Sequence, residues 1–188
     1  MRQWRSKKLK MEQNKRAQIW VETVIYTLIG LSLIGLVLAI VTPRINEMSD
    51  RSIIEQTAES LSIFDSKMRE VLSAPGNVRV VEFKMKRGSL FFNGTGDEIR
   101  YVIDDSRSLY SEPGAIIKNG RLKVLTEKGS KRHKVSLWMN YSQDLTFDGV
   151  DNPDFEKFSA ASVPYKFSIE NKGFQNVGRF QIDIKEIS

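Results

Sequence analysis

Four aspartates towards the C-terminal end of the chain could supply the oxygen ligands that calcium binds. Calcium is held by carboxylate and carbonyl oxygens in polar loops, and such a loop is expected at residues 148–162, "DGVDNPDFEKFSAAS". The four residues are Asp144, Asp148, Asp151 and Asp154. Their spacing does not follow the EF-hand pattern, so we interpret the stretch as a solvated loop without a metal ion.

Two asparagines could accept a sugar at the side-chain amide. Asn93 begins "NGT" and Asn140 begins "NYS", and both tripeptides match the acceptor pattern for N-glycosylation. Two such tripeptides are close to the number expected by chance in a chain of this composition. Both asparagines are therefore candidate sites whose use depends on an extracytoplasmic location.

Other reactive residue types are scarce. The chain has no cysteine and one histidine, His133, which excludes disulfides, cysteine nucleophiles and histidine clusters. We interpret His133 and its basic neighbours as a solvated hairpin tip; these neighbours are Lys128, Lys131, Arg132 and Lys134. No nucleophile elbow, phosphate loop or metal motif is present, so the sequence predicts neither an enzyme nor a cofactor.

The remaining chemically notable residue is Glu22, a carboxylate at the start of a long apolar run. Residues 23–43 contain no charge, and a helix of that length spans about 30 Å, the thickness of a bilayer core. A buried core helix or an ordinary cleaved signal is the alternative. A cleaved signal would have a shorter apolar region that ends at small residues, whereas this run ends in "VTPR".

The charge distribution predicts how this helix inserts. Residues 1–17 hold seven lysines and arginines and one glutamate, so this leader alone accounts for the formal net charge of +6. A basic segment before an apolar run stays in the cytoplasm, which places the C-terminal bulk outside. The rest of the chain is neutral, which argues against nucleic-acid binding, because that function requires a basic face on the folded domain.

The stretch "KRAQIWVETVIYTLIGL" resembles precursors of the type IV pilin superfamily, and archaeal members most closely. Such precursors carry a class III signal peptide, in which the apolar helix follows the cleavage site. The resemblance implies cleavage between Ala17 and Gln18, after Lys15 and Arg16, by a membrane prepilin peptidase. Glu22 then occupies mature position five, where many members have glutamate. Ala17 departs from the family's usual glycine. The implied partners are this peptidase, membrane lipid before assembly, and other pilin subunits in a homo- or hetero-filament.

The physical chemistry of Glu22 is consistent with this resemblance. A carboxylate in hydrocarbon is costly and tends to pair with a cation. Cleavage would create an α-ammonium group at Gln18, one helical turn away or on a neighbouring subunit, and pairing would compensate both charges. The pair would set the axial register between subunits. The alternative is that Glu22 lies at headgroup level and contacts water.

Beyond the apolar run, the sequence predicts an amphipathic helix and then strands. Pro43 should bend the helix without ending it. Apolar residues at steps of three and four continue to Leu72, and "APG" at 74–76 ends the pattern. We expect this face to pack on the protein's own sheet, with a coiled-coil seam as the alternative. Nine β segments follow, at 78–85, 89–93, 98–104, 114–118, 121–127, 134–142, 144–149, 165–171 and 179–187.

Turn signals complete the β region. We expect hairpin turns at 86–88, "KRG", and at 118–121, "KNGR", and a loop at 127–133.

The predicted class is α+β: leader 1–17, membrane or filament-core helix 18–43, amphipathic helix 44–74, and an extracellular antiparallel β-rich domain 75–188. The predicted function is a structural subunit, major or minor, of a type IV pilus-like surface filament. The alternative is an uncleaved, membrane-anchored extracytoplasmic binding or accessory module of a surface machine.

Overall fold

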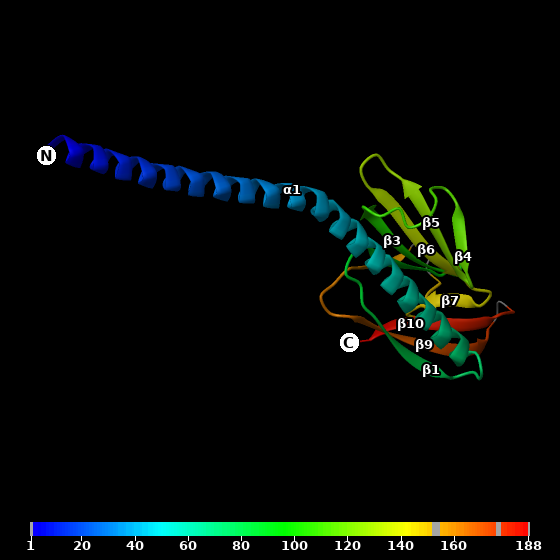
Figure 1. The fold of residues 1–188 in the computed structure, drawn as a ribbon. Helices are drawn as coiled ribbons and strands as arrows, with labels where there is room; N and C mark the ends of the chain where they lie inside the picture. The colour runs from blue at the N-terminus through cyan, green and yellow to red at the C-terminus, as the bar shows by residue number, and fades with distance from the viewer. Residues whose placement is uncertain (1, 152–154, 176–177, 188) are drawn as a thin grey trace. The chain divides into compact units, whose positions relative to one another are not determined.

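The computed structural model describes residues 2–151, 155–175 and 178–187, with side chains from Ile19 onward. The fold is α+β, as predicted, with one helix followed by two β-sheets within the described residues (Figure 1). The elements are α1 (Arg2–Val71), β1 (Val78–Phe83), β2 (Ser89–Asn93), β3 (Glu98–Ser106), β4 (Ile116–Asn119), β5 (Leu122–Lys128), β6 (His133–Asn140), β7 (Asp144–Phe147), β8 (Glu156–Ser159), β9 (Tyr165–Phe174) and β10 (Phe180–Ile187).

The chain divides into two units, Met1–Asn46 and Glu47–Ser188, and we describe each by itself. Within the first unit, α1 begins at Arg2 and continues through Pro43. Proline lacks an N–H group, so the carbonyl of Ala39 loses its usual helical donor. The helix continues to Val71 despite this missing hydrogen bond. The prediction that Pro43 does not end the helix is confirmed.

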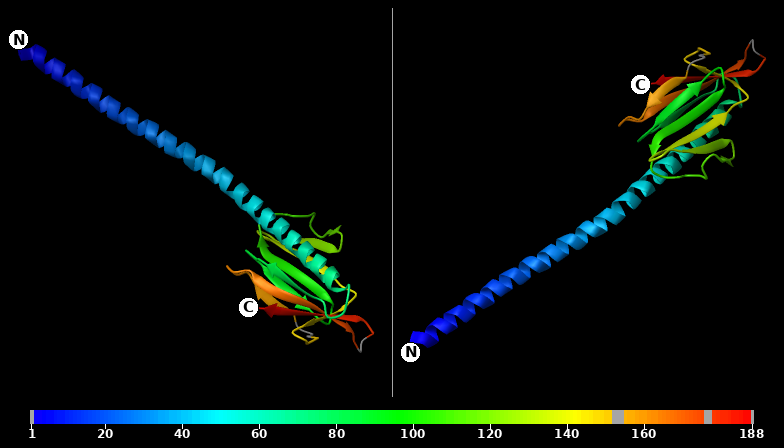
Figure 2. Two further views of the ribbon diagram at one scale, coloured as in Figure 1. Left: turned by 90° about the horizontal axis from the view of Figure 1, so that it is seen from below. Right: turned by 90° about the horizontal axis from the view of Figure 1, so that it is seen from above.

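In the second unit, the C-terminal part of α1 packs on the protein's own β-sheets, as expected (Figure 2). Its buried apolar side chains recur at helical spacing and are Ile54, Leu61, Phe64, Met68 and Val71. The buried face is shorter than the predicted amphipathic helix, 44–74, because Met48 is 72% exposed. Packing therefore begins near Asp50, which is buried and accepts a 2.7 Å hydrogen bond from the backbone N–H of Arg107.

The strands form two sheets with strand orders β1-β9-β10-β7 and β4-β5-β6-β3-β2-β8. All nine predicted segments form strands, and the "KNGR" turn joins β4 to β5 as expected, with Gly120 at a φ of 60°. One pairing departs from the antiparallel prediction, because β7 runs parallel to β10. Buried Asp183 of β10 fixes this pair by accepting hydrogen bonds from the Thr146 hydroxyl (2.8 Å) and the Gly149 N–H (2.7 Å).

Two further expectations were wrong. Residues 86–88 do not form a hairpin, because β1 and β2 belong to different sheets and the turn carries the chain from one sheet to the other. The polar stretch 148–162 contains a strand, β8, which pairs with β2 at the sheet edge. Only one face of an edge strand needs to be apolar, and here Phe158 is the one buried side chain.

Aromatic rings join the helix to both sheets in the core. Phe64 of α1 lies 5.9 Å from Phe92 in the six-stranded sheet and 6.3 Å from Phe167 in the four-stranded sheet, measured between ring centroids. Phe167 also packs edge-on against Phe158 of β8 at 5.1 Å. Such offset and edge-to-face pairs contribute beyond simple area burial, so these four rings connect α1, β2, β8 and β9 into one core.

The C-terminal end of α1 is capped by Asn171, which lies in β9. The last carbonyls of a helix have no partner within it. The Asn171 side-chain amide, which is fully buried, donates to the carbonyls of Val71 (3.0 Å) and Ala74 (3.2 Å). Its side-chain oxygen accepts the Gly173 N–H at 2.9 Å. A single side chain thus satisfies three backbone groups, two of them in fully buried contacts.

Replacing Asn171 with leucine should therefore lower the free energy of unfolding by about 2–4 kcal/mol, because the change leaves buried backbone groups without partners. Chemical denaturation of fragment 47–188 measures the change. Lys172→Ala, at the adjacent exposed position, is the control and should cost less than about 0.5 kcal/mol. Equal stabilities for the two variants would contradict the capping role.

Candidate membrane and assembly site

Residues 19–43 of α1 present an apolar surface that no other part of the first unit covers. One helix in the described chain is long and apolar enough to cross a membrane, and its most apolar window is 0% buried. Exposed side chains lie on every side of the helix, as the three consecutive residues Leu36, Val37 and Leu38 show, since each is more than half exposed. An apolar surface of this length requires lipid or other protein chains around it.

The serine and threonine hydroxyl groups in this segment are satisfied within the helix itself. Each donates to the carbonyl four residues earlier: Thr23 to Ile19, Thr27 to Thr23, Ser32 to Leu28 and Thr42 to Leu38, at 2.7–2.9 Å. Back-bonding of this kind removes the cost of placing a hydroxyl in an apolar environment. The surface is therefore suited to hydrocarbon and to close packing against other helices.

Glu22 lies at the N-terminal end of this surface, with Tyr26 one turn further along. The Tyr26 hydroxyl donates a 3.2 Å hydrogen bond to Oε1 of Glu22. The contact is a neutral donor on a carboxylate, so it orients the side chain without compensating its negative charge. The sequence analysis did not predict this contact, although the spacing of four residues on a helix could have indicated it.

The proposed processing residues lie at the edge of what the structure describes. The backbone of Lys15, Arg16, Ala17 and Gln18 belongs to α1, whereas their side chains lie outside the described part. The structure thus places the Ala17–Gln18 bond within a helix. It does not test the predicted cleavage.

Comparison with known proteins finds no match among family models, curated proteins or solved structures. The architecture is nevertheless pilin-like, since a long apolar N-terminal helix precedes a mostly antiparallel β domain. The helix also suggests membrane anchoring or a signal.

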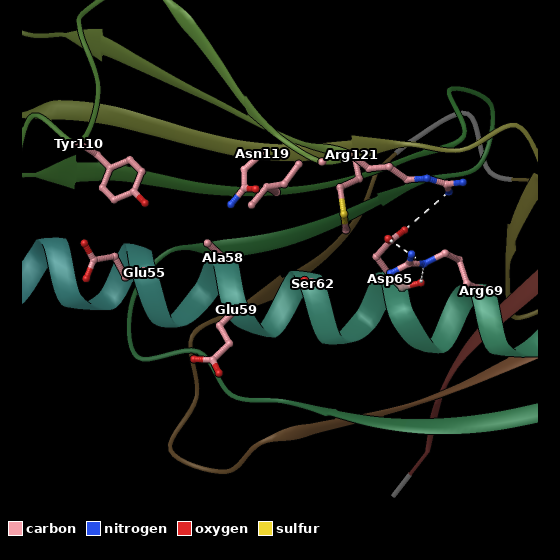
Figure 3. A pocket seen from close by; sticks show the side chains of 12 residues that line it. Glu55, Ala58, Glu59, Ser62, Asp65, Arg69, Tyr110, Asn119 and Arg121 are labelled. Carbon is pink, nitrogen blue, oxygen red and sulfur yellow. Dashed lines mark hydrogen bonds and ion pairs between the residues drawn. The ribbon is translucent and has the colours of Figure 1, made fainter.

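A groove of about 610 Å³ lies in the second unit, between α1 and the β4–β5 hairpin (Figure 3). Asp65 is its most buried charged residue and pairs with Arg69 at 3.3 Å and with Arg121 at 3.7 Å. Burial, together with the neighbouring Asp65 carboxylate, raises the pKa of Tyr141, so this phenol stays protonated. The charged groups at this end of the groove neutralise one another and offer no activated nucleophile.

Two of the four aspartates considered as calcium ligands are held by cations or by an amide instead. Asp144 is buried, accepts a 3.1 Å hydrogen bond from Gln181 and lies 3.6 Å from Arg179. Asp148 pairs with Lys185 at 2.9 Å. Asp151 is exposed, and Asp154 lies outside the described residues. The described part of the chain holds no group of three potential metal-ligating side chains.

The remaining predicted residues lie in the six-stranded sheet. His133 begins β6 and is half-buried, and nearby Arg132 pairs with Asp105 at 3.3 Å. Asn93 ends β2 and Asn140 ends β6. Both candidate glycosylation sites therefore lie at strand ends, in neighbouring parts of one sheet.

These pairings predict that metal removal does not affect the β domain. Fragment 47–188 should be soluble, rich in β-structure by circular dichroism, and unchanged in Tm by EDTA or by a reductant, because Asp144 and Asp148 already have cationic partners and the chain has no cysteine. A loss of several degrees in EDTA that added calcium reverses would contradict this expectation.

Proposed function

We propose that the protein is a structural subunit of a type IV pilus-like surface filament rather than an enzyme. The observation that carries the proposal is the uncovered, charge-free surface of α1 with Glu22 at its N-terminal end. A membrane anchor alone needs the apolar surface but not the carboxylate. A helix that moves from lipid into a bundle of identical helices can use both.

The first step in this function is insertion and processing. The basic leader remains in the cytoplasm and the β domain lies outside, following the charge asymmetry around the span. A prepilin peptidase then cleaves between Ala17 and Gln18. Lipid covers the apolar helix until assembly, when other subunits replace it.

The second step is assembly, in which Glu22 acts as a register residue. The new α-ammonium group of Gln18 lies one turn from Glu22 along the helix, and a neighbouring subunit brings the same group from outside. Tyr26 holds one carboxylate oxygen of Glu22, which fixes the direction in which the charge points. Pairing between subunits compensates two charges in a low-dielectric bundle, and only one axial offset permits it.

The alternative function is an uncleaved, membrane-anchored binding or accessory module. The same span and the same β domain support it. The two functions differ in whether the native chain loses its leader.

The mature protein should begin at Gln18. N-terminal sequencing or intact-mass measurement of native protein from its membranes decides this. A chain that retains Met1 or Arg2 in cells with an active prepilin peptidase would replace the filament function with the anchored module.

Glu22→Gln should leave insertion and leader removal nearly intact but weaken filament assembly. Glutamine still accepts the Tyr26 hydrogen bond, so the variant removes only the charge. Leaving one partner of a buried ion pair alone costs about 3–5 kcal/mol, and screening near headgroups reduces that cost. The measurement compares processed subunit in membranes with subunit in sheared filaments.

Tyr26→Phe is the control and should assemble better than Glu22→Gln. Normal filament yield from Glu22→Gln would show that Glu22 merely contacts water at the interface.

A further inference from the structure

The six-stranded sheet carries a row of aromatic and basic residues on the face opposite the core. Strand register places Phe91 of β2, Arg100 of β3 and Trp138 of β6 directly beside one another. The row continues to Lys157 in β8 and Lys123 in β5. The Arg100 guanidinium lies 5.6 Å from the Trp138 ring centroid, and the Lys157 ammonium lies 5.8 Å from that of Phe91. Both rings are only half-buried.

The next row on the same face contains both sequon asparagines. Asn93 pairs with Glu98, and Glu98 pairs with Asn140. Because side chains two residues apart on a strand share a face, Asn93 lies beside Phe91 and Asn140 lies beside Trp138. Each sequon asparagine thus has an aromatic residue two positions before it. Because aromatic residues make up only 10% of the chain, this coincidence is not expected by chance.

Asn93 is placed where its amide nitrogen can react. It ends β2 and starts the turn to β3, and its side-chain oxygen accepts the Gly96 N–H at 3.0 Å. This bond uses the oxygen and leaves the amide nitrogen as the reacting atom. A depression of about 220 Å³ lies on the same face and is lined by Phe91, Arg100, Val102, Asp104, Lys134 and Phe155.

Asn140 is held in a geometry that tolerates substitution at its nitrogen. Lys123 donates to its side-chain oxygen at 2.9 Å, and its amide nitrogen donates to Glu98 at 3.2 Å. A glycosylated asparagine keeps one N–H and its carbonyl oxygen, so both contacts are compatible with an attached sugar.

We propose that Asn93 and Asn140 carry N-linked glycans whose first sugars stack on Phe91 and Trp138. The apolar C–H face of a pyranose ring matches the flat face of an aromatic ring, and the contact removes apolar surface from water. Arg100 and Lys157, beside the two rings, supply hydrogen-bond donors for sugar hydroxyls. The proposal rests on the extracytoplasmic location in the proposed function.

The covalent step needs a donor sugar activated on a membrane lipid through phosphate or pyrophosphate. The asparagine nitrogen attacks the anomeric carbon, a C–N bond forms, and the bond from that carbon to the phosphate oxygen breaks. The amide loses one proton and the lipid phosphate departs with the electron pair. A membrane glycosyltransferase of the host cell supplies the donor and the catalysis.

Mass spectrometry of the native protein tests the modification. Peptides containing Asn93 and Asn140 should each carry a glycan mass. Thr95→Ala and Ser142→Ala destroy the sequons while leaving both asparagines and their hydrogen bonds in place, so each variant should lose one glycan. Unmodified asparagines in native protein whose domain lies outside would overturn the proposal.

Thermal unfolding of purified full-length protein tests the stacking. The glycan at Asn93 should raise Tm by about 2–4 °C, as expected for one modest contact in a domain of this size, and Thr95→Ala should lose this gain. In the Phe91→Leu background, which keeps an apolar side chain without a flat face, Thr95→Ala should change Tm by less than about 1 °C. Phe91→Tyr should restore the gain. An equal glycan effect in all three backgrounds would overturn the stacking.

A topology measurement separates this proposal from the proposed function. The chain has no cysteine, so Ser130→Cys at the exposed β5–β6 turn creates a single label site. If a membrane-impermeant maleimide labels intact cells while Asn93 and Asn140 are unmodified, the glycan proposal is wrong and the extracytoplasmic location is supported. If the maleimide labels lysed cells but not intact cells, both the extracytoplasmic location and the glycan proposal are wrong.

Discussion

An apolar helix surface about 37 Å long, which no other part of the first unit covers, is the constraint on which the rest of this protein depends. Residues 19–43 have neither a sheet nor another helix against them in the first unit. The serine and threonine hydroxyls along this surface bond to the helix backbone, so these side chains do not require water. The partner must therefore come from outside the first unit, and under the proposed function it is lipid, other subunits, or each in turn. Glu22 is the single feature by which those partners can be distinguished.

In the second unit, the same helix packs against the protein's own sheets. From Asp50 to Val71, α1 supplies one apolar stripe to a core that both sheets share. Phe64 touches a ring from each sheet, and Asn171 closes the helix end. Polar contacts set the limits of the packed segment at both ends, because Asp50 accepts a backbone N–H where packing begins and Asn171 donates where the helix stops. The apolar stripe between them supplies most of the contact.

Local signals in the sequence were enough to predict some of these features but not others. The apolar run, the helical stripe and the Asn-Gly hairpin depend on neighbouring residues, and all three were predicted. The role of Lys86–Gly88 was not, because turn chemistry does not report whether the next strand joins the same sheet. Strand β8 escaped notice because an edge strand needs only Phe158 to be apolar. In the candidate site, Glu22 stood out by its charge, whereas its hydrogen bond from Tyr26 was overlooked. Asn171 could not have been found, because nothing near it in sequence indicates a helix end 100 residues earlier.

That separation between Asn171 and the helix it caps has a consequence for biosynthesis. The span at 19–43 leaves the ribosome early and can enter the membrane while most of the β domain is still unmade. The four-stranded sheet, in contrast, pairs β1 with β9 and β10 with β7, so it cannot close until the last strands emerge. A chain interrupted after β8 would keep the apolar helix yet leave Phe64 and Phe92 without Phe167. If the chain is inserted as proposed, completion of the final two strands marks the point at which an inserted chain becomes a folded one.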